Sequence, residues 1–465
     1  MKKKITLLLI FVTIIFLIYF INSFKVSSYN SKVDLTTYFS FDNGYTYNSN
    51  DSIFISKFSK PNEKLLIIDY INGDTLTEKT NSKIEDLRKY KFVDLHKRKT
   101  TDTILPIKKG VYILELGEGE DVFRDMIFVN DYSRVDNEIE VFISISDYNW
   151  IAYNSFGGRS NYDDRITPFY FKGIQILSSF ISTPLYKFKF NLSKLYPLSK
   201  NRPNLINHQE LTQFMNGNFD KKFHCVVSEL PLIKLIDSLG IKYKIIDSKE
   251  FERFDSSNKD KLFVFNGHSE YWSSRMMGKL KILKEKNNFL FFSGNNIYRE
   301  VLDDGQLTII NQETDKKSVT ELVGTYYDDS DYLVNSTLKI NKNHFLFQGI
   351  EADEIGGEYV MDFETDKVNE FTPKNTEILG TGTINNGDIV LLKNQKNKYL
   401  LNTSSIGSYT GLEEKNFRKF IVNYINFSLN KDWLILVGEK KPLKKRGFKG
   451  GPTWTRTRDQ MIMSH

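Results

Sequence analysis

The stretch that decides the fold is KLFVFNGHSEYWS, residues 261–273. It begins with an apolar run typical of a buried strand and continues into a polar and aromatic loop, after which residues 274–286 show a helical pattern. Open α/β sheets bind ligands in the loops that follow the carboxyl ends of their strands. His268 and Glu270 are therefore candidate functional residues.

Strand and helix patterns alternate on both sides of this stretch. Residues 140–146 (EVFISIS), 242–247 (KYKIID) and 288–296 (NFLFFSGNN) are predicted strands, and residues 228–240 (SELPLIKLIDSLG) are a predicted helix that ends at a glycine. This alternation predicts an α/β domain over residues 136–437, built on a doubly wound parallel sheet.

Residues 25–135 have a different pattern. Short apolar runs such as KLLIIDYI and GVYILELG are separated by polar or glycine-containing turns. The spacing predicts a small antiparallel β-sandwich without a functional site of its own.

The N-terminus carries a hydrophobic segment. Lys2–Lys4 precede the uncharged run Ile5–Ile21, about 17 residues, which is just long enough to span a bilayer. We expect residues 1–24 to form an uncleaved signal anchor, with a cleaved signal peptide as the alternative. The lysines favour a membrane-anchored protein whose domain faces the periplasm or the cell exterior.

The C-terminal residues 438–465 are basic and show neither a helical nor a strand period. Thr453–Arg458 (TWTRTR) can be encoded by DNA whose complementary strand forms the stem and loop of a transfer-RNA T arm. We expect an unstructured tail that arises from translation into a transfer-RNA gene.

Composition excludes several classes of protein. The chain has 64 basic and 58 acidic residues, a net charge of +6, and its basic residues are spread along the sequence, which argues against nucleic acid as a partner. Cys225 is the only cysteine, so an internal disulfide and a cysteine-rich metal site are excluded. We interpret Cys225 as a buried apolar residue.

Three strand ends carry the residues of a recognisable pattern. They are Trp150–Tyr162 (WIAYNSFGGRSNY), Gly267–Trp272 (GHSEYW) and Ser293–Asn296 (SGNN). Together they resemble the C-terminal domain of the N,N-dimethylformamidase large (beta) subunit, over roughly residues 136–435. The resemblance implies a glutamine-amidotransferase-like α/β fold without the cysteine nucleophile.

The resemblance also implies a mononuclear ferric iron held by two tyrosines and one glutamate. Glu270 is the corresponding carboxylate, and Tyr153 is the better candidate for the first tyrosine. Tyr196 is the first choice for the second tyrosine, with Tyr148 or Tyr162 as alternatives. Tyrosine has an ordinary pKa of about 10, so a phenolate ligand requires a hard, strongly Lewis-acidic cation such as ferric iron.

His268 and Asn296 would then be catalytic polar groups near the metal, and Glu354 an additional acidic residue. Each has a plainer interpretation. His268 and Asn296 can serve as structural hydrogen-bonding groups at strand ends, Glu354 can be a solvated charge, and Glu270 can be a first-turn acid of the following helix.

The sequence therefore predicts a membrane-anchored, metal-dependent hydrolase of a carbon–nitrogen bond in a small amide-like substrate. The alternative is a non-catalytic module on the same fold that binds a glycan or another envelope component. The oligomeric state is left open.

Overall fold

The computed structural model describes residues 38–431, except for 42–43, 59–63, 80–101, 105–106, 120, 134–135, 157–159, 162–196, 218–222, 328–334 and 385. Within these residues the largest sheet has nine strands, in the order β11-β9-β12-β14-β23-β22-β21-β18-β19. The first five are mutually parallel: β11 (Tyr243–Ile246), β9 (Val141–Ser144), β12 (Leu262–Asn266), β14 (Asn288–Phe292) and β23 (Tyr399–Asn402).

The other four strands of this sheet are antiparallel to their neighbours. They are β22 (Asp388–Lys393), β21 (Thr376–Gly382), β18 (Leu338–Ile340) and β19 (Glu354–Ile355). The predicted fold class, a doubly wound parallel sheet, is therefore wrong: the main sheet is mixed, and the smaller sheets are antiparallel or mixed. The reason is local, because β21 and β22 are joined by residues 383–387 only, whereas a parallel pair needs a crossover of a dozen or more residues.

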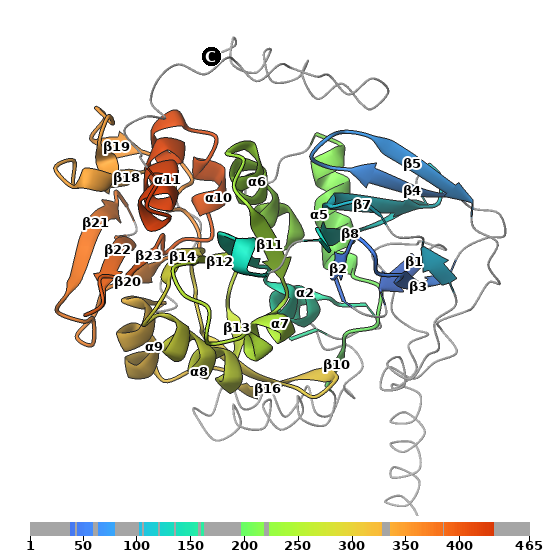
Figure 1. Cartoon of the computed structure of the whole chain (residues 1–465), viewed down its shortest axis with the longest axis horizontal. Helices are drawn as coiled ribbons and strands as arrows, with labels where there is room; N and C mark the ends of the chain where they lie inside the picture. Colours follow the sequence, from blue (N-terminus) through green and yellow to red (C-terminus); the bar gives the residue numbers. More distant parts are fainter. Residues whose placement is uncertain are drawn as a thin grey trace, which may run out of the picture.

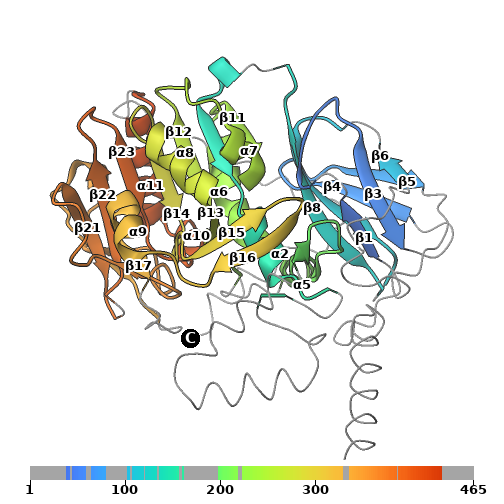
Figure 2. The same cartoon turned by 90° about the horizontal axis from the view of Figure 1, so that it is seen from below.

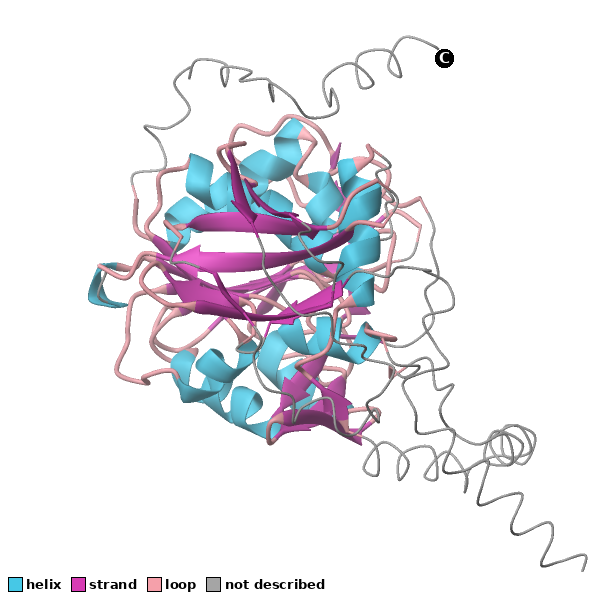
Figure 3. Ribbon diagram, turned by 90° about the vertical axis from the view of Figure 1, so that its right-hand side faces the viewer, coloured by secondary structure: helices cyan, strands magenta, loops and turns pink. Residues whose placement is uncertain are grey.

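Helices cover both faces of the main sheet (Figures 1 and 3). One face carries α6 (Val226–Ser238), α10 (Ser408–Gly411) and α11 (Lys415–Ser428), and the other carries α7 (Ser248–Arg253), α8 (Ser274–Leu283) and α9 (Lys316–Val323). The central strands β12 and β14 are buried along their whole length, with burial on both faces as expected for a sheet enclosed by helices. Phe263 stacks on Phe289 of the next strand at 5.2 Å between ring centroids.

The N-terminal part consists of two further sheets (Figure 2). One contains β1 (Tyr38–Phe41), β3 (Ile53–Phe58) and β6 (Asp102–Ile104); the other contains β2 (Thr46–Asn48), β8 (Phe123–Asn130), β7 (Gly110–Leu116), β4 (Lys64–Asp69) and β5 (Thr75–Lys79). Asn130, at the end of β8, exchanges two hydrogen bonds of 2.8 Å with the backbone of Ile245 in β11. This pair ties the N-terminal sheet to the edge strand of the main sheet.

Short elements complete the described chain. Helix α2 (Asp147–Tyr153) follows β9, and α5 (Leu205–Met215) packs on β8. A four-stranded sheet joins β10 (Leu198–Ser199), β16 (Gln306–Asn311), β15 (Arg299–Asp303) and β13 (Tyr271–Ser273), and a small pair joins β17 (Tyr326–Tyr327) to β20 (Asp366–Lys367). The 3₁₀ turns are η4 (Asp136–Glu138) and η5 (Phe345–Phe347).

The predictions for the two chain ends fall outside the described residues. The proposed anchor, residues 1–24, and the proposed tail, residues 438–465, both lie there. Among the described helices none combines the length and apolar character needed to cross a bilayer. The described helices therefore give no support to the expected membrane anchor, or to a domain facing the periplasm or the cell exterior, and this expectation is not carried further.

A buried aspartate in the N-terminal sheet makes the stability of the fold depend on pH. Burial raises the pKa of Asp125 to about 7, despite hydrogen bonds from Asn207 and the backbone of Met126 that act in the opposite direction. The folded state therefore keeps a proton that the unfolded state releases near pH 4. Between about pH 4 and 7 the folded state binds more protons, and the free energy of unfolding falls as pH rises.

Asp125→Asn should reduce the slope of unfolding free energy against pH by at most about 1.4 kcal/mol per pH unit. The asparagine oxygen can still accept both hydrogen bonds, so the variant should fold. Urea unfolding midpoints at pH 5, 6 and 7 measure the slope. Asp304→Asn, at an exposed turn, is the matched control and should keep the wild-type slope. An equal slope in Asp125→Asn would refute the assignment.

Candidate active site

The candidate site lies where the strand order of the main sheet reverses. Strand β9 comes first along the chain, the next strand β11 lies on one side of it, and β12 lies on the other. Sheets form a ligand-binding crevice beyond the carboxyl ends of the strands at such a point. The loops after β9 and β12 are joined here by a 2.7 Å hydrogen bond from Ser146 Oγ to the carbonyl of Asn266.

The loop after β12 is held on both sides. Gly267 has a φ of +68°, and a Cβ at this position would lie 3.0 Å from the buried carboxyl group of Glu229, so a glycine is required. The backbone N–H of Ser269 donates to Ser293 Oγ at 3.0 Å. The backbone N–H groups of residues 270 and 271 both donate to Asn149 Oδ1 at 3.2 Å. The positions of His268 and Glu270 are therefore set by two neighbouring strand ends.

Four side chains from three separate segments converge in front of this loop. The hydroxyl of Tyr153, at the end of α2, donates to Glu270 Oε2 at 3.1 Å. His268 Nε2 lies 3.6 Å from the same oxygen and 3.3 Å from Glu364 Oε2. We call Tyr153, His268, Glu270 and Glu364 the carboxylate cluster.

The carboxylate of Glu270 is buried and oriented. Its side chain is 1% exposed, and its second oxygen, Oε1, pairs with Nε of Arg299. The Arg299 guanidinium is itself held by the carbonyl of Gln312 at 2.9 Å. This arrangement turns Oε2 toward Tyr153 and His268. Glu270 lies before strand β13, so it is not a first-turn acid of helix α8, whose N-cap is Ser273.

His268 is fully buried between two carboxylates. Burial alone would lower its pKa, but Glu364 and then Glu270 outweigh this effect, and the pKa lies above the ordinary value for histidine. In the same way, burial would raise the pKa of Glu364, but His268 and Asn295 outweigh it, and that pKa is lowered. Both shifts have one main source, the 3.3 Å approach of His268 Nε2 to Glu364 Oε2.

Glu364 was not predicted from the sequence, and Glu354 is the additional acidic residue that was predicted. Glu354 is exposed on the edge strand β19, where it accepts a hydrogen bond from Thr337 at 2.9 Å, so the structure does not bring it to the cluster. Glu364 has a φ of +43°, a left-handed conformation that is uncommon outside glycine and asparagine. No motif marks it in the sequence.

The SGNN loop after β14 supports Glu364. Asn295 donates from Nδ2 to Glu364 Oε2 at 2.7 Å, and its backbone N–H donates to Asp366 Oδ1 at 2.7 Å. Asn296 donates from Nδ2 to Asp366 Oδ2 at 3.0 Å. Asn296, predicted as a catalytic group, is thus hydrogen-bonded to Asp366, whose pKa burial raises to about 7.

None of the three candidates for the second tyrosine is found at the carboxylate cluster in the described part of the chain. Tyr196 and Tyr162 lie outside them. Tyr148 is buried and donates to Asp303 at 3.0 Å and to Glu252 at 3.3 Å. Burial, followed by the nearby carboxylates, raises its pKa well above the ordinary value, which disfavours a phenolate at this position.

A second group of potential metal ligands adjoins the cluster. One ligand atom each of Glu210, His224 and Cys225 lie within 4.8 Å of one another. The His224 ring contacts those of Tyr153, at 4.7 Å between centroids, and His268, at 6.0 Å. The Glu210 carboxylate accepts three backbone N–H groups at the start of α6, so it also serves as a helix cap.

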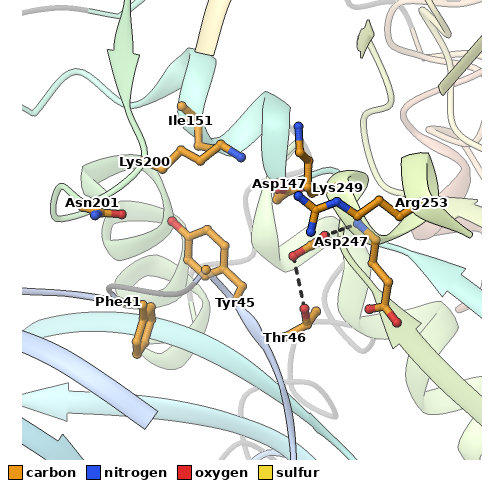
Figure 4. A pocket seen from close by; sticks show the side chains of 12 residues that line it. Phe41, Tyr45, Thr46, Asp147, Ile151, Lys200, Asn201, Asp247, Lys249 and Arg253 are labelled. Atoms are coloured by element: carbon orange, nitrogen blue, oxygen red, sulfur yellow. Dashed lines mark hydrogen bonds between the residues drawn. The ribbon is translucent and has the colours of Figure 1, made fainter. Parts of the chain in front are cut away.

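A pocket of about 440 Å³ lies at the opposite end of α2 (Figure 4). It is lined by residues of both signs, and Asp147, at the start of α2, is among them. Asp247 accepts a hydrogen bond from Thr46 at 3.3 Å, and Lys249 pairs with Glu252 at 3.1 Å. Much of the charge in this pocket is thus compensated within the chain, and none of the predicted site residues lines it.

Fold and site together define a class: a mixed α/β protein with carboxylate, imidazole and phenol groups at the crevice of its sheet. The particular family follows from comparison with known proteins. The family described as N,N-dimethylformamidase beta subunit-like, C-terminal, matches residues 99–316. This match confirms the resemblance predicted from the three motifs, and it supports a dimethylformamidase-like hydrolase. Glu364 lies beyond its end.

Other comparisons add little. No curated protein matches the chain. A solved structure described as that of a GMP synthase subunit, from Thermoplasma acidophilum, matches with 12% identity and a TM-score of 0.27, over 43% of this chain and 88% of that one.

Proposed function

We propose that this protein hydrolyses a carbon–nitrogen bond in an amide-like substrate, and that the carboxylate cluster is its active site. The observation that carries the proposal is the convergence of Tyr153, His268, Glu270 and Glu364 on one buried point. These residues supply a carboxylate, a phenol and a proton-carrying imidazole side by side. The family match agrees with this chemistry.

The donor set fits a hard cation. Glu270 Oε2 and the Tyr153 hydroxyl, the two oxygen donors, are 3.1 Å apart. Oxygen donors of this kind suit ferric iron better than zinc, which usually takes histidine and cysteine. Tyr153 and Glu270 would hold the ion, with Tyr196 proposed as a further ligand. Such an ion supplies Lewis acidity toward an amide carbonyl and lowers the pKa of water.

Residues of the chain itself would hold the proton that is transferred to the leaving nitrogen. His268 Nε2, which lies 3.6 Å from Glu270 Oε2 and 3.3 Å from Glu364 Oε2, would be the atom that holds the proton. It would deliver this proton to the departing amide nitrogen as general acid. Glu364 would stabilise the imidazolium, and Arg299 would keep Glu270 oriented.

The binding-module alternative is less well supported. Sugar-binding sites expose the faces of aromatic rings, whereas Trp150 and Trp272, the tryptophans of the two motifs, are both 0% exposed. They pack within the core, and Trp272 lies against Phe265 at 4.5 Å between centroids. These two tryptophans are thus structural supports for the loops.

Tyr153→Phe tests the proposed metal site. The full-length protein should contain iron and show a phenolate-to-iron absorption band; the variant should lose the band. Its rate of formamide hydrolysis should fall by at least about a hundredfold, an effect that even outer-sphere substitutions reach at metal sites. Tyr132→Phe, at an exposed position, is the control. Wild-type protein without bound metal, or Tyr153→Phe with full activity, would count against the proposal.

A further inference from the structure

Glu210, His224 and Cys225 bring three different donor atoms together beside the carboxylate cluster. One ligand atom of each residue lies within 4.8 Å of the other two. Around a tetrahedral zinc ion with bonds of about 2.0–2.3 Å, the ligand atoms are roughly 3.3–3.8 Å apart. The three side chains therefore need to move by only about 1 Å to close around one ion.

The donor set of these three residues is typical of zinc sites. A carboxylate oxygen, an imidazole nitrogen and a thiolate sulfur are the kinds of ligand that Zn²⁺ takes in proteins. They differ from the phenol and carboxylate oxygens of Tyr153 and Glu270, which suit a harder cation. The group around Cys225 therefore favours a different metal from the one proposed at the carboxylate cluster.

The Glu210 carboxylate is held in place and still has room for a metal. Its Oε1 accepts the backbone N–H groups of His224 and Cys225, both at 3.0 Å, and its Oε2 accepts that of Val227 at 3.1 Å. A carboxylate offers about four acceptor positions, so within the described residues one position on Oε2 remains. Carboxylates that bind metals are themselves hydrogen-bonded in this way. The three N–H groups thus orient Glu210 for a metal.

Cys225 stands at a position that does not otherwise call for a cysteine. It is the N-cap of α6, where serine, threonine, aspartate and asparagine are preferred, and its side chain makes no capping hydrogen bond. Glu210 caps this helix instead. The thiol is thus left for another role, and it lies within reach of the Glu210 carboxylate and the His224 ring.

The buried charge of this region lacks a basic partner. Glu210 and Glu229 are 4% and 0% exposed, and among the described residues neither forms an ion pair with a lysine or an arginine. Buried charges are normally paired or coordinate a metal. His224 is only half-buried, which leaves a path by which an ion can enter.

We infer that Glu210, His224 and Cys225 bind a divalent transition metal of the zinc type. This site is separate from the ion proposed at Tyr153 and Glu270 and does not depend on the proposed function. Three protein ligands leave a fourth position for water. The His224 ring contacts that of Tyr153 at 4.7 Å between centroids, so a metal that fixes His224 also supports Tyr153.

Cobalt(II) is the probe for this site, with the full-length protein. Cys225 is the only cysteine of the chain, so a sulfur-to-cobalt charge-transfer band in the near ultraviolet can arise only from Cys225. Titration with cobalt should produce this band, and added zinc should displace the cobalt and remove it. If the folded protein gave no such band, the inference would be overturned, and Cys225 would be a buried apolar residue only.

His224→Gln tests whether the imidazole is a ligand. The affinity for cobalt, followed by the sulfur band, should fall by at least about a hundredfold, because substitutions outside the ligand sphere alone cost ten- to a hundredfold. His344→Gln is the matched control, since His344 faces Glu377 at 3.5 Å, and it should keep the wild-type affinity. Equal affinity in the two variants would overturn the assignment of His224.

Two further variants separate this site from the carboxylate cluster. Tyr153→Phe should keep the sulfur-to-cobalt band although it loses the iron band; loss of both would mean that the two sites are one. Cys225→Ser places a preferred residue at the N-cap, so it should fold. Its zinc content after equilibrium dialysis should be one equivalent below that of the wild type, and an unchanged zinc content would contradict the inference.

Discussion

Replacing Glu270 by glutamine should abolish iron binding and reduce amide hydrolysis by at least about a thousandfold, while the protein stays folded. Loss of a charged ligand removes both the ion and the activated water that it provides, and transition-state stabilisation of several kcal/mol corresponds to this factor. Iron content, the absorption spectrum and kcat/KM for formamide measure the effect.

The fold should survive because the backbone of this residue is held independently of its carboxylate. The N–H of Glu270 donates to Asn149 at 3.2 Å, and its carbonyl accepts the N–H of Arg299 at 2.9 Å. The Arg299 guanidinium keeps its bonds to Gln312. An unchanged circular dichroism spectrum and thermal midpoint would confirm this point.

Glu300→Gln is the matched control. Glu300 follows Arg299 on β15, but its carboxylate accepts a hydrogen bond from Asn311 outside the cluster. This variant should keep its metal and its activity. If Glu270→Gln bound iron as well as the control does, the carboxylate cluster would not be a metal site.

The strands and loops of the parallel part could be predicted from sequence because their signals are local. An unbroken apolar run such as Leu262–Phe265 is typical of a strand buried on both faces, and polar residues directly after it mark its carboxyl end. Such reasoning placed His268 and Glu270 on one loop, and the structure brings Tyr153 next to them. Their catalytic and metal-binding roles stay predictions.

The antiparallel half of the sheet and Glu364 could not be predicted in this way. Strands β18, β19 and β21 are short or half-exposed, and the number of strands added to a sheet edge depends on long-range pairing. Glu364 reaches His268 across 96 residues of sequence, and only the backbone geometry that Asp366 and Asn295 impose puts it there. The helical spacing and motif patterns used for the other residues contain no information on such a contact.

The close packing of three backbone segments explains why the position of Glu364 relative to His268 is fixed. The loop after β14, the segment around Glu364 and the loop after β23 meet at Gly294. A Cβ on Gly294 would lie 2.2 Å from the carbonyl oxygen of Glu364 and 2.7 Å from the Cα of Ser405. Both are backbone atoms, which cannot rotate away as the end of a side chain could. The three segments can therefore pack this closely only because Gly294 has no side chain.

Gly294→Ala should accordingly destabilise the protein by about 3 kcal/mol or more, at the upper end of the cost of overpacking. It should also displace Glu364 from His268, so hydrolysis should fall even at temperatures where the variant is folded. Urea unfolding and kcat/KM for formamide measure the two effects separately. Gly278→Ala is the matched control: it lies within α8, where a Cβ would meet open space, and it should be neutral or stabilising by about 0.5–1 kcal/mol. Equal stability of the two variants would mean that the three segments do not pack as closely as the structure has them.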